Sequence, residues 1–322
     1  MTVKYIFVVN LYAGKGNKIE KLKQSVTEAC TSRGLDFVVY MTTAIGDAER
    51  YVRQICEENR ESGEVLRIFA CGGDGTINEC FNGAVDFENV ELGVIPIGTG
   101  NDFVRNFGGA EAFLDIDVQL DSNTKRIDLI KYNDRYCVNM INVGFDCDVA
   151  ARTSTLKKKS WIPSKFAYIS GLLVEFVKKT GTEFRCKVDG TEAEDRKLLL
   201  SLFANGGFCG GGFFAAPEAE LYDGFLDFCF IRDISRLRFL SLVGYYKKGT
   251  HLTLEDCDEF FDYGKCREVE LFFDSPRRIC VDGEIETVDH VHMQIVKQAI
   301  SLVVPGHIKR EDTANTSTTV GA

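Results

Sequence analysis

The chain has 322 residues, of which 45% are hydrophobic and 27% are charged, and its formal net charge is −10. This composition is typical of a globular protein, and the length is sufficient for two domains. The negative charge argues against a general nucleic-acid-binding protein, because such proteins are usually basic.

The cysteines and the N-terminal sequence together predict a cytoplasmic protein. The twelve cysteines include no Cys-x-x-Cys pair, so reduced thiols are expected rather than a disulfide framework or a zinc site. Residues 1–9 lack the long apolar core and cleavage site of a signal peptide. The longest uncharged stretch, 198–217, contains Asn205 and several glycines, a composition that suits a strand and loop rather than a membrane-spanning helix.

The first third of the chain alternates expected strands with expected helices. The strands are placed at 4–9, 37–41, 65–70 and 92–95, and the helices at 18–31, 48–60 and 76–84. This alternation predicts a parallel sheet with right-handed crossovers, in which ligands lie beyond the carboxyl ends of the strands. A loop rich in polar residues or glycine follows each strand, so we expect these loops to form a site at one edge of the sheet.

The run Cys-Gly-Gly-Asp-Gly-Thr-Ile-Asn-Glu at 71–79 predicts a phosphate-binding turn. Its glycines let backbone N–H groups approach an anion, and the following helix N-terminus adds a positive partial charge. It is not a Walker A motif, and it departs from the dinucleotide fingerprint because Asn78 stands where the third glycine is required. The alternative is a tight turn between strand and helix that binds no ligand.

From about residue 125 the expected elements are mostly antiparallel strands. They are placed at 126–132, 136–143, 182–188, 197–204, 225–231, 268–273, 278–281 and 291–296, with helices near 164–179 and 235–248. A last strand at 300–304 is expected to return to the first domain. We therefore predict an α/β domain over 1–125 to which 298–308 returns, a β-rich domain over 126–297, and a flexible tail over 309–322.

Two aspartates and three other polar residues stand at the strand ends of the first domain. Asp74 and Asp102 are candidates to hold one magnesium ion, since Mg²⁺ is held by one or two carboxylates with phosphates and water. The alternative is that both cap helices, because Asp is a preferred N-cap residue. Asn10, Thr42 and Thr99 suit hydrogen bonds to phosphate or ribose, or else stabilise their own loops.

The string Asp282-Gly283-Glu284 has two interpretations. An Asp-Gly pair between strands is typical of a hairpin turn, as expected also at Asp189-Gly190. Alternatively, Asp282 is a general base near a substrate hydroxyl, because phosphoryl transfer needs a group that orients the hydroxyl and accepts its proton. Spacing alone favours the turn.

Three further segments also have two interpretations. Asp223, in the loop 220–225, fits either a site for a hard cation or a turn. His290 and His292 alternate on one strand face, which favours a half-exposed strand over a metal site. The run Lys-Lys-Lys-Ser-Trp-Ile at 157–162 is either a contact with an anionic bilayer, through its first three residues, or a solvated loop.

Four separated motifs resemble those of the bacterial diacylglycerol kinase-like lipid kinases, a family related to sphingosine and ceramide kinases and, more distantly, to NAD kinases. They are Gly-Gly-Asp-Gly-Thr at 72–76, Pro-Ile-Gly-Thr-Gly-Asn-Asp-Phe at 96–103, the glycine-rich and Asp-Gly elements of 205–227, and Asp-Gly-Glu at 282–284. The resemblance extends nearly to Pro305, and the second motif is its most specific part. One departure is Asn10-Leu11, where the family often has Asn-Pro.

This resemblance implies a Rossmann-like three-layer α/β nucleotide-binding domain and a β-sandwich domain, with ATP between them and Mg²⁺ as cofactor. The implied nucleotide site comprises Asn10, Gly14, Thr42, Gly72, Gly73, Asp74, Gly75, Thr76, Asn78, Glu79, Thr99, Asn101 and Asp102. Asp74 and Asp102 correspond to a magnesium network. Asp223, with main-chain oxygens at Glu220 and Phe225, corresponds to a structural magnesium site. Asp282 corresponds to the proposed general base and Glu284 to its neighbour.

We therefore expect an ATP- and Mg²⁺-dependent lipid kinase, with diacylglycerol as the first-choice acceptor and phosphatidic acid as product. One alternative is a different acceptor, either a sphingoid or other long-chain alcohol or NAD, and another is a non-catalytic nucleotide or lipid sensor. The expected partner is a membrane lipid met at the bilayer surface, with no nucleic acid. A homodimer is an open alternative to a monomer.

Overall fold

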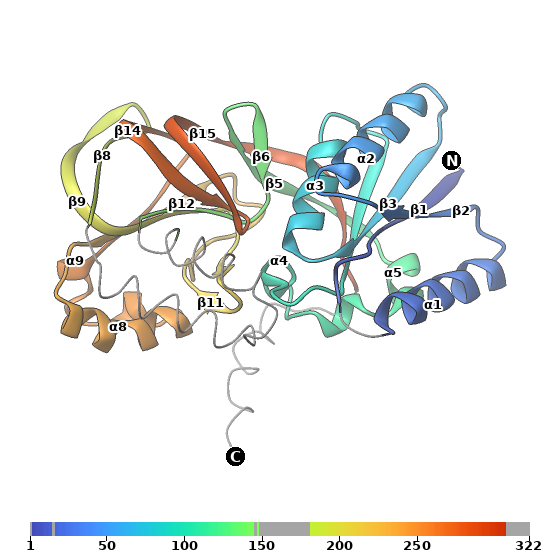
Figure 1. Cartoon of the computed structure of the whole chain (residues 1–322), viewed down its shortest axis with the longest axis horizontal. Coiled ribbons are helices and arrows are strands. Elements are labelled where there is room, and N and C mark those ends of the chain that lie inside the picture. The colour runs from blue at the N-terminus through green and yellow to red at the C-terminus, as the bar shows by residue number, and fades with distance from the viewer. Residues whose placement is uncertain (1, 15–16, 145–146, 148–180, 307–322) are drawn as a thin grey trace, which may run out of the picture. The chain divides into compact units, whose positions relative to one another are not determined.

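The computed structural model describes residues 2–14, 17–144, 147 and 181–306 (Figure 1). The chain divides into unit 1, residues 1–129 with 297–322, and unit 2, residues 130–296. Three predicted features lie outside the described residues, namely the helix at 164–179, the basic run 157–159 and the tail 309–322.

Unit 1 contains a parallel sheet in which the order of strands is β4-β3-β1-β2. The strands are β1 (Val3–Asn10), β2 (Phe37–Thr42), β3 (Val65–Gly72) and β4 (Val90–Pro96). The central strands are apolar runs that are buried on both faces, as expected of a parallel sheet. Asn10 pairs with Thr42, and Gly72 pairs with Pro96, so all four strands end at the same edge.

Helices cover both faces of this sheet (Figure 1). They are α1 (Lys18–Ser32), α2 (Asp47–Glu58), α3 (Asp74–Ala84), α4 (Asp102–Arg105), the 3₁₀ turn η1 (Glu111–Phe113) and α5 (Ile116–Asp121). Leu22, Val26 and Ala29 recur on one side of α1 and pack with α5 against β1 and β3. Helices α2 and α3 lie on the opposite face (Figure 1). The predicted three-layer α/β architecture is thus confirmed.

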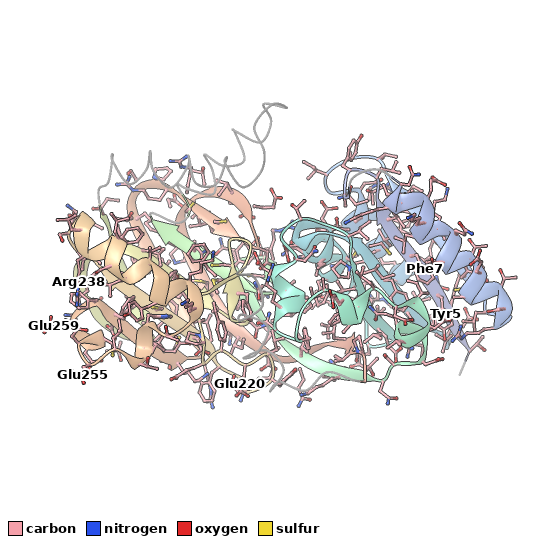
Figure 2. All side chains as sticks on the ribbon, turned by 90° about the horizontal axis from the view of Figure 1, so that it is seen from below. Tyr5, Phe7, Glu220, Arg238, Glu255 and Glu259 are labelled. Atoms are coloured by element: carbon pink, nitrogen blue, oxygen red, sulfur yellow. The ribbon has the colours of Figure 1, made fainter. Side chains whose placement is uncertain are left out.

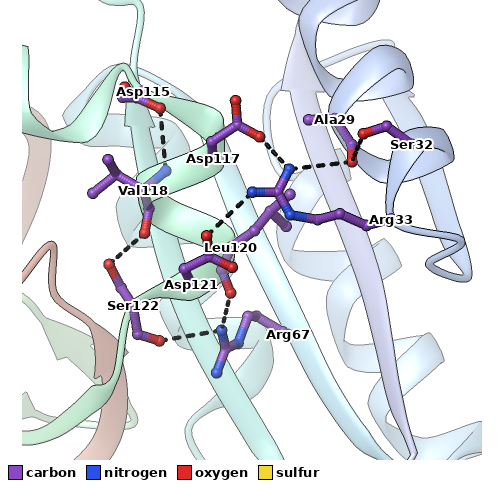
Figure 3. A network of polar contacts seen from close by, with 10 residues as sticks. All are labelled: Ala29, Ser32, Arg33, Arg67, Asp115, Asp117, Val118, Leu120, Asp121 and Ser122. Carbon is purple, nitrogen blue, oxygen red and sulfur yellow. Dashed lines mark hydrogen bonds and ion pairs between the residues drawn. The ribbon is translucent and has the colours of Figure 1, made fainter.

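Two arginines join α5 to the rest of unit 1 (Figure 3). Arg33, at the end of α1, makes ion pairs with Asp117 and Asp121 of α5. Arg67 of β3 donates from Nε to Glu91 at 2.7 Å and from Nη1 to the carbonyl oxygens of Leu120 and Ser122 at 3.0 and 3.2 Å. The end of α5 is therefore held by an arginine that the sheet itself supplies.

Unit 2 is β-rich, as predicted. The strands of this region are β5 (Thr124–Tyr132), β6 (Arg135–Cys137), β7 (Met140–Gly144), β8 (Thr182–Val188), β9 (Thr191–Ala204), β10 (Phe208–Cys209), β11 (Phe213–Phe214), β12 (Leu226–Arg232), β13 (Phe261–Cys266), β14 (Glu268–Val281) and β15 (Glu284–Val303). Strands β13-β12-β9-β7-β14-β15 follow one another in the sheet, and their pairings are antiparallel. The chain leaves unit 1 within β5 and returns within β15, whose Ser301 and Leu302 pair in parallel with β4.

Two pairs of predicted strands are single strands in the structure. The segments 268–273 and 278–281 both belong to β14, whose register shifts between Phe272 and Arg277. Pro276 falls inside this shift and has no N–H for the ladder, which explains the break in the sequence pattern. The segments 291–296 and 300–304 lie within or at the end of β15, which contains Gln298 at a φ of +48°.

The helices of unit 2 are α8 (Arg236–Lys248), the 3₁₀ turn η2 (His251–Thr253) and α9 (Cys257–Phe260). Helix α8 confirms the prediction at 235–248. Its Leu242 and Tyr246 pack on strand residues such as Leu200 and Ile231 in one apolar core, and a second core includes Phe203. Within the part of the chain that the structure describes, no helix is both long and apolar enough to span a membrane.

Candidate active site

Two glycine-rich turns of unit 1 are in direct backbone contact. The N–H of Gly98 donates to the carbonyl oxygen of Gly72 at 3.1 Å. A Cβ added to Gly98 would lie only 2.5 Å from the Cα of Gly73. Because this approach leaves no space for a side chain, the sequence requires glycine here. The turns after β3 and β4 therefore form one continuous backbone surface.

Asp74 and Asp102 border the same point of this surface. A Cβ added to Gly100 would lie 2.9 Å from Oδ2 of Asp74 and 3.8 Å from Oδ2 of Asp102. Oδ1 of Asp74 accepts a hydrogen bond from the N–H of Phe103 at 3.1 Å, and Asp102 makes an ion pair with Arg105 at 3.3 Å. Two acidic groups from neighbouring strand ends are thus brought together.

The capping alternative holds for Asp74 in a modified form, since it caps the neighbouring helix rather than its own. The N-cap residues of α3 and α4 are Gly73 and Asn101, and neither helix has a side-chain cap from its own N-terminus. Asp74 instead accepts from the first turn of α4, the neighbouring helix. A pair of carboxylates next to a glycine surface provides the hard oxygen donors that Mg²⁺ prefers, so these residues fit the implied ion.

The loop after β1 contacts both glycine turns. Nδ2 of Asn10 donates to Oγ1 of Thr76 at 2.9 Å, while its Oδ1 accepts from the N–H of Tyr12 at 2.8 Å. Gly14 has a φ of +84°, and a Cβ there would lie 3.4 Å from the carbonyl oxygen of Ile97. Asn10 therefore acts in its own loop and also fixes the start of α3.

The loop after β2 is held by Glu79 of α3. Oε1 of Glu79 accepts from the N–H of Gly46 at 2.9 Å, and Oε2 accepts from the N–H of Ala48 at 3.1 Å. Glu79 was predicted to contact the nucleotide, but both of its carboxylate oxygens accept hydrogen bonds from the protein backbone. Thr42 is buried at the end of β2, directly beside Asn10 in the register.

Asp47 stabilises the same loop from the first turn of α2. The N–H of Thr43 donates to Oδ2 of Asp47 at 2.8 Å, and Arg50, the Thr43 hydroxyl and the Tyr40 hydroxyl add further bonds. The Thr43 N–H is the main reason that the pKa of Asp47 falls to about 2. The carboxylate is therefore ionised at neutral pH, next to the positive end of the helix dipole.

The other residues predicted for this site lie on the same turns. Gly75 is the second residue of α3, and Asn78 accepts through its side chain from Asn82 one turn later. Thr99 is exposed. Asn101 has a φ of +53° and donates from Nδ2 to the carbonyl oxygen of Gly98 at 3.1 Å. The predicted site residues left out Gly98 and Gly100, although both belong to the 96–103 motif on which the resemblance was based.

In unit 2, Asp282 occupies the turn between β14 and β15. Asp282 and Gly283 have φ values of +46° and +93°, and the flanking residues Val281 and Glu284 pair directly, as in a two-residue hairpin. Its Oδ1 accepts from the N–H groups of Asn139 and Met140 at 2.9 and 3.0 Å, and Oδ2 accepts from Val138 at 2.7 Å. Glu284 is exposed.

The turn at Asp189-Gly190 has the same construction as the turn at Asp282. Asp189 has a φ of +48°, and its Oδ1 accepts from the N–H groups of Arg267 and Glu268 at 2.9 and 3.0 Å. The bonds at Asp282 therefore support the turn interpretation that spacing favoured. They are also compatible with a second role, so general-base action at Asp282 stays a prediction that needs a matched control.

The predicted magnesium site of unit 2 contains a lysine. Oδ1 of Asp223 accepts a hydrogen bond from the N–H of Phe225 at 3.0 Å, and Oδ2 accepts one from Nζ of Lys265 at 2.9 Å. Lys265 also binds Oδ2 of Asp227 and the carbonyl oxygen of Glu218, each at 2.9 Å. Burial lowers the pKa of Lys265, but its bonds to Asp223 and Asp227 outweigh this and raise it. The ammonium is therefore charged at neutral pH.

The oxygen atoms around Asp223 could bind a hard cation, but that cation would compete with the ammonium group of Lys265 for the Asp223 carboxylate. One carboxylate and the main-chain oxygens at Glu220 and Phe225 are ligands of the kind that Mg²⁺ accepts. Among the described residues there is no cluster of three acidic, histidine or cysteine side chains that could hold a metal. Lys265 was missed at the sequence level, because only the register shows that it pairs with Asp227.

The histidines of β15 agree with the prediction of a half-exposed strand. The ring of His290 packs at a tilt of 37° against that of Phe272 and its Nε2 lies 3.7 Å from Glu270, whereas Nε2 of His292 lies 2.5 Å from Glu268. Each histidine therefore faces a carboxylate on the neighbouring strand β14.

The fold and these turns define a class of two-domain proteins that join an α/β unit with paired glycine turns to a β-rich unit. The chain belongs to the diacylglycerol kinase-like family. Its residues 4–132 match the family described as "Diacylglycerol kinase catalytic domain", and residues 139–304 match the "YegS C-terminal NAD kinase beta sandwich-like domain".

Proteins of related sequence match most of the chain. A protein of Staphylococcus epidermidis, provisionally named a lipid kinase, is 28% identical over 289 residues, which are 89% of this chain and 91% of the relative. A similarly named protein of Staphylococcus aureus is 25% identical over 280 residues, or 86% of this chain and 90% of the relative.

Solved structures show the same fold. A protein of Bacillus anthracis, provisionally titled a diacylglycerol kinase, has a TM-score of 0.74 at 20% identity and covers 95% of this chain and 98% of its own. A second structure from this organism, titled a diacylglycerol kinase, has a TM-score of 0.70 at 19% identity with the same coverage.

Proposed function

We propose that the protein is a lipid kinase that transfers the γ-phosphate of ATP to a lipid hydroxyl, with diacylglycerol as the first-choice acceptor. The observation that carries this proposal is the contact between the two glycine turns, with Asp74 and Asp102 at its border. Closely spaced glycine backbones suit a phosphate chain, and the two carboxylates suit the cation that would neutralise it. Membership of the diacylglycerol kinase-like family supports the same activity.

In the proposed reaction, one group of residues binds the nucleotide and Mg²⁺, and another residue accepts a proton. Asn10, Gly14, Thr42 and residues 72–78 would hold the nucleotide, Glu79 would position the loop after β2, and Asp74 and Asp102 would hold Mg²⁺. When bound, Mg²⁺ would supply charge neutralisation on the phosphates. Asp282 would accept the proton of the lipid hydroxyl as its oxygen bonds to phosphorus and ADP leaves, with Glu284 as its neighbour. We further propose a cytoplasmic location with peripheral membrane contact.

The test of Asp282 needs a control because its carboxylate also stabilises a turn. Asp282→Ala and Asp189→Ala each remove a carboxylate that accepts backbone N–H groups from a neighbouring strand. Both variants should therefore be less stable than the parent. Only Asp282→Ala should abolish phosphate transfer while it retains ATP binding. Normal turnover by Asp282→Ala, or equal loss in both variants, would remove the assignment.

The acceptor is identified by a parallel screen. Labelled phosphate transfer from ATP is measured with diacylglycerol, a sphingoid base and a long-chain alcohol in detergent micelles, and with NAD in solution. Transfer to a lipid with none to NAD supports the proposal. Transfer to NAD alone would assign the soluble acceptor instead, and ATP binding without transfer to any acceptor would favour a sensor.

A further inference from the structure

Helix α8 carries apolar side chains on two opposite sides. Leu242 and Tyr246 are buried in the core of unit 2. On the other side, Leu237, Leu240 and Tyr245 have exposed fractions of 82%, 48% and 47%. A surface helix normally presents polar residues to water, so packing within the described part of unit 2 leaves these three side chains unexplained.

The exposed residues of α8 form one continuous stripe. We define the outer face of α8 as Leu237, Leu240, Ser241, Gly244, Tyr245 and Lys248, which recur at the spacing of one helical side. A Cβ added to Gly244 would meet no atom within 4 Å. Figure 2 looks onto unit 2 from the side on which this helix lies. The stripe is therefore a surface and not a partly filled groove.

The charge of α8 is opposite to that of the chain. Its sequence, Arg-Leu-Arg-Phe-Leu-Ser-Leu-Val-Gly-Tyr-Tyr-Lys-Lys, contains basic residues and no acidic residue, whereas the whole chain has a net charge of −10. Lys247 and Lys248 are exposed at its C-terminal end. Exposed leucines and a tyrosine bordered by lysines are typical of a helix that lies in the interface of an anionic bilayer.

Acidic residues on one flank set the orientation of such a contact. Glu255 and Glu259 lie near the same end of unit 2 as Arg238 (Figure 2). Arg238 makes an ion pair with Asp256, and its guanidinium lies 4.2 Å from the ring centre of Phe260. Anionic lipid would repel this acidic flank, so the electrostatic attraction of the outer face comes from the lysine-bearing C-terminal end of α8.

We propose that the outer face of α8 docks on an anionic lipid bilayer. Leu237, Leu240 and Tyr245 would enter the headgroup region, and Lys248 would pair with lipid phosphates. The proposal rests on the proposed function only in that a lipid acceptor must be reached at a membrane. It concerns a different part of the chain from the basic run 157–159.

The test measures vesicle binding without ATP, so it does not depend on turnover. The parent and two variants, Leu237→Ser and Lys248→Gln, are sedimented with vesicles of phosphatidylcholine alone or mixed with phosphatidylglycerol. Leu114→Ser and Lys21→Gln are matched controls, since both are exposed residues of unit 1. Binding to the mixed vesicles should fall about tenfold for Leu237→Ser and about fivefold for Lys248→Gln, with little change in the controls.

Other occupants of the face give different results. Unchanged vesicle binding in both α8 variants, or no binding by the parent, would overturn the proposal. A shift from dimer to monomer in Leu237→Ser, measured by analytical ultracentrifugation, would assign the face to a second copy of the chain. A fall in melting temperature well beyond that of Leu114→Ser would show that the chain itself covers the face. Either result would also overturn it.

A parallel assay separates this proposal from the lipid kinase proposal. Phosphate transfer to diacylglycerol dispersed in detergent micelles should be unchanged in Leu237→Ser and Lys248→Gln, because micelles supply the acceptor without a bilayer surface. Weaker vesicle binding with full micelle turnover supports both proposals. Unchanged vesicle binding with full micelle turnover removes only the docking surface, and absence of micelle turnover in the parent removes only the kinase proposal.

Discussion

Oε1 of Glu79 lies 2.9 Å from the amide nitrogen of Gly46, and this bond joins the glycine-motif helix α3 to the loop after β2. The second carboxylate oxygen accepts from Ala48 in the same loop. Glu79 therefore positions the segment that follows Thr42 and leaves no carboxylate oxygen unused. We therefore expect Glu79 to act on the proposed nucleotide site through this loop rather than by touching ATP.

Replacing Glu79 should weaken nucleotide binding more than it slows transfer. We expect Glu79→Ala to raise KM for ATP about tenfold with little change in kcat, because the loop loses two charge-assisted hydrogen bonds. Glu79→Gln, which retains one acceptor, should have a smaller effect. Steady-state kinetics check this, with exposed Glu88→Gln as control. A lower kcat at unchanged KM would contradict the positioning role.

The two glycines of the 96–103 turn should differ in their tolerance of alanine. At Gly98 the added Cβ meets the backbone of Gly73, which cannot move without disrupting β3, whereas at Gly100 it meets the side chain of Asp74, which can rotate. Gly98→Ala should therefore reduce ATP affinity by about a hundredfold and Gly100→Ala by about tenfold. Calorimetric titration measures both affinities, and Gly244→Ala serves as a control without a clash. Equal losses would contradict this explanation.

The arginines of Figure 3 should contribute unequally to stability. Arg67 has a side-chain exposed fraction of 13% and Glu91 one of 23%, whereas the partners of Arg33, Asp117 and Asp121, are exposed by 64% and 72%. Arg67→Met leaves a half-buried carboxylate and two carbonyl oxygens unpaired, so we expect a loss of about 2–3 kcal/mol. Arg33→Met should cost much less, because its ion pairs are exposed to solvent. Urea unfolding of both variants tests this ranking.

His251 should make the protein sensitive to mild acid. It is fully buried between Tyr246 and Phe261, and burial lowers its pKa from 6.5 to about 4. The folded state therefore binds this proton less readily than the unfolded state does. Neutral His251 therefore contributes to the free energy of unfolding in full above pH 6.5. This contribution, up to about 3 kcal/mol, is lost as the pH falls towards 4.

The check is a series of melting curves between pH 7.5 and pH 4. His251→Phe removes the titrating group and keeps an aromatic ring, so its melting temperature should decline less steeply over this interval than that of the parent. Parallel declines in the two proteins would show that other groups cause the acid sensitivity.

Magnesium should stabilise unit 2 through Asp223, and Lys265 should oppose its binding. In the absence of ATP, whose phosphates would complete the proposed site at Asp74 and Asp102, we expect Mg²⁺ to raise the melting temperature of the parent and a chelator to reverse the rise, whereas Asp223→Asn should abolish the response. Lys265→Met should lower the melting temperature without metal and increase the response to Mg²⁺, because a competing charge is gone. Asp274→Asn, an exposed site of unit 2, is the control. A full response in Asp223→Asn would place the ion elsewhere.

Local patterns in the sequence were sufficient to predict the α/β unit. The apolar run 65–70 meets glycines and then a helix, and this arrangement is encoded by neighbouring residues. Helix α3 begins at Asp74, two residues earlier than expected, because Gly73 supplies the N-cap. The edge that gathers the four loops follows directly from parallel strands.

Contacts between distant residues could not be predicted in this way. Asp282 accepts hydrogen bonds from the amides of 138–140, and the Asp-Gly hairpin pattern alone does not identify the segment that supplies them. The pair of Lys265 with Asp227 depends on the register between β12 and β13. The length of β14 was hidden by Pro276, since a register shift lets one strand tolerate a residue that normally ends it.

The pairing of Ser301 and Leu302 with β4 has a consequence for biosynthesis. Strands β1 to β4 leave the ribosome long before this partner, and the whole of unit 2 is translated in between. At ordinary elongation rates, one side of β4 waits on the order of ten seconds for its final neighbour. A nascent chain with an open strand edge can pair wrongly with other chains, so chaperone demand should be greatest during this interval and should end with synthesis of the last strand.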